Sequence, residues 1–155
     1  MGVEKVPFSV IFAAANKEQT KIDPEFDADF QYEYFPSHVN KEIVFNYKPD
    51  RTMIQADLIM NLPAHEQFSK AGDSPEVGLP TKMMNSIFNT RGNALGHARF
   101  IWYAASKADR TGFGASVAKV DQWDFDRIIP CHGDVIESGG KQIFRNVMQF
   151  YLKNR

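Results

Sequence analysis

The chain has 155 residues, of which 43% are hydrophobic, so it is long and apolar enough for one domain with a core and unlike a disordered protein. A formal net charge of −1 gives no excess of Lys and Arg that would favour nucleic acid or an anionic membrane. No apolar stretch approaches the roughly 20 residues that cross a bilayer, and one cysteine alone excludes an internal disulfide. These features predict a single domain over residues 1–155, in a reducing compartment such as the cytoplasm.

The first third of the sequence is expected to form strands. Aromatic residues at positions 30, 32 and 34 alternate with polar residues, which is the period-two pattern of a half-buried strand. Pro49 lies in a turn between two apolar runs, and this arrangement predicts a β-hairpin. A polar, acidic stretch at residues 16–29 is expected to be a connector. The other expected strands are Phe8–Ala13, Glu42–Tyr47 and Thr52–Ile59.

The pattern changes after residues 61–80, which are rich in Pro, Gly and Ser and predict a long loop. Apolar residues then recur every three or four positions, as they do in amphipathic helices. A short apolar strand and a glycine-containing turn precede the last helix. Helices are expected from Thr81, around His97–Ala105, at Phe113–Gln122 and from Gly140, with the strand at Arg127–Cys131. This order predicts a layered α/β or α+β domain.

Three polar side chains follow expected strands and could carry chemistry. His38 comes directly after the first alternating strand, Asp57 lies near the end of the second hairpin strand, and His132 follows the RIIPC strand. A side chain at a strand end is held by the sheet but projects toward loops. Imidazole and carboxylate are the ligands of hydrolytic zinc sites because they leave the metal Lewis-acidic.

The two segments HVNKEIVFNYKPDRTMIQADLIMNLP and WDFDRIIPCHGDVIESGGK, with their His, Asp and His-Gly in this order, resemble the metallo-β-lactamase-fold hydrolases. They are closest in character to an uncharacterised fungal branch of that superfamily. The resemblance covers nearly the whole chain, but only the C-terminal half of the superfamily fold. It implies half of an αββα sandwich, with a mixed sheet and helices on one face.

The resemblance also implies a role for each of the three residues. His38 matches a ligand of the first metal and His132 a ligand of the second, while Asp57 matches the catalytic carboxylate that bridges both metals. The His-x-His-x-Asp-His motif that supplies most ligands is missing. Zinc is the expected metal, and iron or manganese would also accept such mixed ligands. Two ligands hold zinc poorly. Alternatively, one metal could gather all three residues as a His₂Asp set, at a point to which the resemblance does not direct them. Without metal, the same residues would be polar groups that end strands.

Other candidates have weaker support. Asp134 is spaced to act as a group that orients His132 from behind, or as a solvated turn residue. Cys131 is expected to be a buried structural thiol. His65 lacks the second histidine of a helical zinc motif and is expected in a surface loop, and His97 is expected to be packed in a helix interface.

These observations favour a metal-dependent hydrolase that is incomplete or inactive as this chain, with a small-molecule substrate that the sequence does not define. The alternative is a non-catalytic interaction module. Half of a layered fold would expose an apolar face, which predicts a homodimer or a partner that supplies the first half. A third reading is a truncated piece without independent function.

Overall fold

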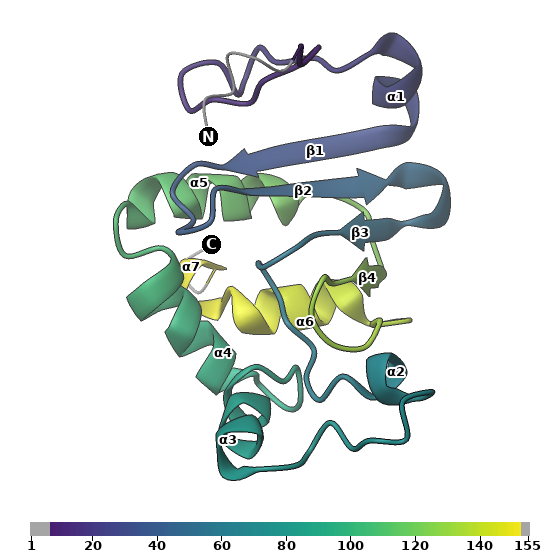
Figure 1. Ribbon diagram of the computed structural model, residues 1–155. Helices are drawn as coiled ribbons and strands as arrows, with labels where there is room; N and C mark the ends of the chain where they lie inside the picture. Colours follow the sequence, from purple (N-terminus) through teal and green to yellow (C-terminus); the bar gives the residue numbers. More distant parts are fainter. Residues whose placement is uncertain (1–6, 153–155) are drawn as a thin grey trace.

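One four-stranded mixed sheet organises the chain in the computed structural model, which describes residues 7–152 (Figure 1). The strand order is β1-β2-β3-β4, with antiparallel β1–β2 and β2–β3 pairs and a parallel β3–β4 pair. The strands are β1 (Phe30–Phe35), β2 (Glu42–Tyr47), β3 (Thr52–Ile54) and β4 (Arg127–Ile129). The expected α+β fold with a mixed sheet is therefore confirmed.

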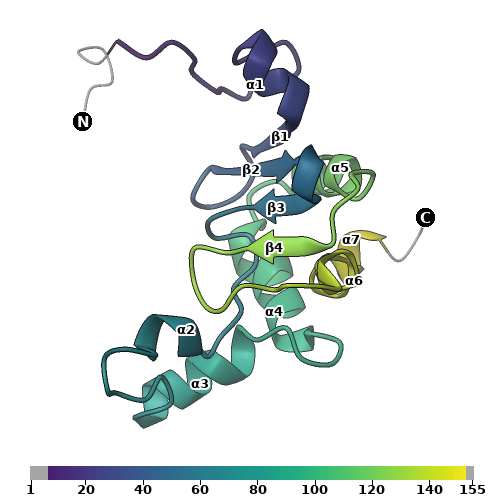
Figure 2. The ribbon, with the colours of Figure 1, turned by 90° about the vertical axis from the view of Figure 1, so that its right-hand side faces the viewer.

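Helices cover one face of this sheet, as Figures 1 and 2 show for α5 and α6. Helix α5 begins after Asp109, whose carboxylate accepts a hydrogen bond from Gly112 N, a normal N-cap arrangement. Phe35, Val44 and Met53 point from the sheet into this layer and are fully buried. The helices of this part of the chain are α4 (Leu95–Phe100), the π-helix η3 (Ile101–Ala105), α5 (Arg110–Val120), α6 (Gly140–Val147) and α7 (Gln149–Leu152).

The opposite face of the sheet is aromatic. The cross-strand pairs Phe30–Tyr47 and Tyr32–Phe45 lie on this face and are only half-buried. Phe12 packs edge-on against Tyr32 with ring centroids 5.7 Å apart. The N-terminal segment therefore covers part of an apolar surface that the helical layer leaves open.

Two short helices and one longer helix lie outside these layers. They are α1 (Pro24–Asp29), α2 (His65–Phe68) and α3 (Leu79–Ile87). Helix α1 was not expected, although Asp23 caps it and Pro24 fills its first turn, a common start signal. Helices α2 and α3 lie together beyond β4, at the end of the molecule opposite α1 (Figure 2).

Three expected strands differ from the structure, and one of them, Arg127–Cys131, ends at Ile129. The prediction of a strand at Phe8–Ala13 is wrong, because this segment is irregular and Phe8 is half-exposed. The strand predicted at Thr52–Ile59 ends at Ile54, because side chains replace strand pairing beyond that residue. Gln55 Oε1 accepts hydrogen bonds from the N–H groups of Leu58 and Ile59. Between residues 7 and 152, no helix is long and apolar enough to span a membrane.

Candidate functional site

The strand directions bring the three candidate residues to one edge of the sheet. Because β1, β3 and β4 run the same way, their C-terminal ends lie at the same edge. His38, Asp57 and His132 each lie three residues after the end of one of these strands. The sequence predicted that each residue follows a strand, and this topology brings the three strand ends to one edge.

Asp57 and His132 are in contact at this edge. Asp57 Oδ1 lies 3.1 Å from His132 Nε2, and Asp57 Oδ2 accepts a hydrogen bond of 2.6 Å from Asn40 Nδ2. The His132 side chain is 54% exposed and that of Asp57 is 24% exposed. The pair is therefore open to solvent and held from one side by Asn40.

Glu42 fixes the backbone that carries Asp57. This carboxylate is buried at the start of β2 and accepts hydrogen bonds from Ala56 N at 2.9 Å and Asp57 N at 2.7 Å. Burial raises the pKa of Glu42, although the two backbone donors oppose the shift. Neither Glu42 nor Asn40 was singled out from the sequence. The sequence did contain a signal for Glu42. It lies on the same inward face of the strand as Val44, and a charged residue at an inward position needs hydrogen-bond partners.

His38 lies in a different environment. Its side chain is 2% exposed, and the Phe113 ring lies 6.3 Å from it between centroids. His38 Nδ1 accepts a hydrogen bond of 3.2 Å from Asn40 N, while Nε2 is buried without a hydrogen-bond partner. The next residue, Val39, donates its N–H to Ala105 O of the π-helix at 2.9 Å. Burial lowers the pKa of His38, and the charge of Asp57 partly opposes this.

The three residues do not form a metal site in this arrangement. Among residues 7–152, no three His, Cys, Asp or Glu side chains are grouped so that they could hold a metal ion. A neutral His38 that accepts a hydrogen bond at Nδ1 carries its proton on Nε2, so neither nitrogen offers a free lone pair. Asp57 and His132 provide two ligands, whereas stable zinc sites use at least three. Among the described residues, this edge of the sheet therefore offers at most part of a metal site.

The residues flanking His132 support the turn around it. Asp134 Oδ1 accepts a hydrogen bond of 2.8 Å from Glu66 N of α2, so a role in orienting His132 stays a prediction. Cys131 is exposed, and the expectation of a buried thiol is wrong. Ile128 is the inward-facing residue of β4, and Cys131 lies three residues later, so the alternation of this strand does not place it on the inward face.

The two remaining histidines differ in burial. His65 is exposed as the first residue of α2. His97 is completely buried in α4, edge-on to Phe88, and neither of its ring nitrogens has a hydrogen-bond partner. Burial lowers the pKa of His97 to about 4. Its expected place in a packed helix interface is confirmed.

The chain was compared with models of protein families, with curated proteins and with solved structures, and nothing in the three comparisons matches it. The resemblance to metallo-β-lactamase-fold hydrolases thus rests on the sequence segments that carry it.

Proposed function

We propose that this chain is a metallo-β-lactamase-like protein that is incomplete as a metal-dependent hydrolase. Asp57 and His132 would be the metal ligands that it contributes, and further ligands would have to come from elsewhere. His38 would join them only if its turn opened, because the ring is buried and Nδ1 is occupied. As an isolated chain, the protein would have little or no hydrolytic activity.

The contact between Asp57 and His132 carries this proposal. A carboxylate and an imidazole 3.1 Å apart, at the C-terminal ends of parallel strands, are donors of the kind that hydrolytic metal sites use. Glu42 and Asn40 hold Asp57 from two directions, which favours a defined position over a freely moving surface side chain. Such support for a ligand is typical of functional sites.

Zinc titration of the purified chain by calorimetry tests this proposal. The matched control is the double variant Asp57→Ala/His132→Ala. We expect weak, saturable binding by the unmodified chain that the control lacks. Identical heats for the two proteins would exclude the proposed ligand pair, and tight binding that depends on His38 would show a complete site.

A second candidate function is a non-catalytic interaction module, and the aromatic face of the sheet favours it. Phe30, Tyr32 and Tyr47 remain half-buried on that face, beside Ile54, which is exposed. Contiguous apolar surface of this kind usually marks a protein interface. The partner would be a second copy or a protein that supplies the missing half.

Size-exclusion chromatography with light scattering tests this second candidate. A dimer that becomes monomeric in the Ile54→Lys variant would support it, since a charge on the open face opposes association. A compact monomer that binds no apolar dye would count against it. Because Ile54 is outside the Asp57–His132 pair, this test is independent of zinc binding.

A further inference from the structure

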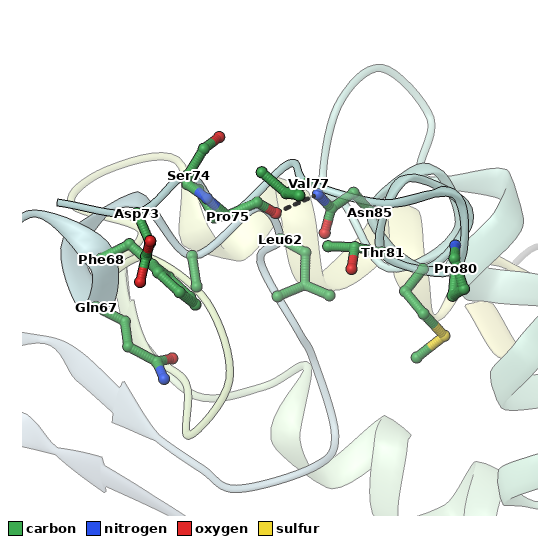
Figure 3. Close-up of a pocket in the computed structure, with 12 residues that line it drawn as sticks. Leu62, Gln67, Phe68, Asp73, Ser74, Pro75, Val77, Pro80, Thr81 and Asn85 are labelled. Atoms are coloured by element: carbon green, nitrogen blue, oxygen red, sulfur yellow. Dashed lines mark hydrogen bonds between the residues drawn. The ribbon is translucent and has the colours of Figure 1, made fainter. Parts of the chain in front are cut away.

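A cavity of about 620 Å³ lies between the α2 region and α3, and neither candidate function uses it (Figure 3). Its size is within the range of pockets that bind small molecules. We propose that it binds an amphiphilic cation, a ligand with an aliphatic body and a primary ammonium group. This inference goes beyond the proposed hydrolase role and does not depend on it.

The walls of the cavity suit an aliphatic body. Leu62, Phe68, Val77 and Met84 are the large apolar residues among those that line it. Figure 3 shows Leu62 between two walls, with Phe68 on one side and the α3 residues on the other. Val77 is 71% exposed and Met84 43%, so apolar surface is available for a ligand to cover. Removing such surface from water favours a complex.

The charge of the lining selects the head group. Asp73 is the one charged side chain among the residues that line the cavity. Across the described part of the chain, its carboxylate has no hydrogen bond or ion pair. A carboxylate beside an apolar wall attracts an ammonium group and repels a carboxylate or phosphate. Gln67 and Thr81 add polar groups to the same lining.

Hydrogen bonds hold the walls of the cavity together. Asn85 Nδ2 of α3 donates to Pro75 O at 3.0 Å and thereby ties the loop to the helix, as the dashed line in Figure 3 marks. Leu62 N donates to Phe88 O at 3.0 Å and fixes the position of Leu62 below the loop. The cavity is therefore built before a ligand arrives, which lowers the cost of binding.

Titration of the full chain with octylammonium chloride tests the proposal, with octanoate as the probe of opposite charge. Binding is measured by calorimetry and by the ¹³C-methyl signals of labelled methionines, with the Met84 signal assigned through the Met84→Leu variant. We expect saturable binding of octylammonium, weaker binding of octanoate, and a shift of the Met84 signal.

The Asp73→Asn variant should weaken octylammonium binding by about two- to fivefold, the size of an exposed ion pair. The matched control is Asp29→Asn, which removes an exposed carboxylate of α1 and should leave the affinity unchanged. Equal affinity for octylammonium and octanoate, an unaltered affinity in Asp73→Asn, or no shift of the Met84 signal would each overturn the assignment.

Discussion

The turn that follows β1 and the turn that follows β4 leave the same edge of the sheet and carry a histidine at the same distance from the strand end. Their environments are opposite. His38 is buried under Phe113 and its turn is bonded to the π-helix, whereas His132 is half-exposed beside Asp57. The strand topology sets where the histidines lie, and the helical layer decides which of them meets solvent.

The largest expected effect on stability comes from removing the ring of Phe113, which packs against His38 in the turn after β1. Phe113→Ala should lower the free energy of unfolding by about 3–5 kcal/mol, because a fully buried ring leaves a cavity. Chemical denaturation measures the loss. The matched control is Phe8→Ala, which removes a half-exposed ring and should change stability by less than about 0.5 kcal/mol. Similar losses in the two variants would contradict the difference in burial.

His97 shows what complete burial does to an imidazole and sharpens the comparison with His132. Since burial lowers the pKa of His97 from 6.5 to about 4, the unfolded chain takes up the proton first as the pH falls. Its stabilising contribution is complete above pH 6.5 and is lost between pH 6.5 and 4. The size of this loss is about 3 kcal/mol.

The His97→Leu variant should lose much of the stability change in this pH range, as measured by denaturation at several pH values. Val120→Ala is the control, since it removes buried side-chain atoms of α5 and keeps the imidazole of His97. That control should have a lower free energy of unfolding at every pH. The slope of this free energy against pH should be the same as in the unmodified chain. A slope in His97→Leu that equals the slope of the unmodified chain would contradict the account.

Glu42 links the buried layer to the exposed pair. Glu42→Gln should lower the free energy of unfolding by about 1–2 kcal/mol, because the amide offers one acceptor oxygen where two backbone N–H groups need partners. NMR hydrogen exchange should be faster at the amides of Ala56 and Asp57 than in the unmodified chain. Unchanged exchange at both amides would show that Glu42 does not hold this loop.

The smallest expected effect is at the exposed turn. His132→Ala should change the free energy of unfolding by less than about 0.5 kcal/mol, as exposed substitutions usually do. His38→Ala, at the equivalent position after β1, should cost about 1–3 kcal/mol. Thermal or chemical denaturation of the two variants side by side measures the difference. Equal losses of unfolding free energy in the two variants would contradict the difference in burial between the two turns.

Local patterns predicted much of this architecture. The alternation at residues 30–35 corresponds to β1, and Pro49 marks the turn of the β2–β3 hairpin. The apolar spacing around Met83 and Phe113 lies within α3 and α5. These elements could be predicted because their hydrophobic periodicity is contained in neighbouring residues.

What could not be predicted depends on contacts between distant parts of the chain. Beyond β3, the N–H groups of Ala56 and Asp57 donate to Glu42, which belongs to the neighbouring strand β2. The burial of His38 is set by Phe113, which belongs to a helix far along the sequence. The positions of His38, Asp57 and His132 after strands could be predicted, but their shared edge depends on the parallel β3–β4 pair, which joins distant segments.

Zinc binding by three forms of the chain tests the central claim most directly: the unmodified protein, His38→Ala and Asp57→Ala/His132→Ala, each shown to be folded by circular dichroism. We predict weak binding that His38→Ala retains and that the double variant loses, because the ligand pair lies on the exposed side of the sheet edge. Binding that the double variant keeps, or that disappears in His38→Ala, would contradict the proposed division between a buried and an exposed histidine.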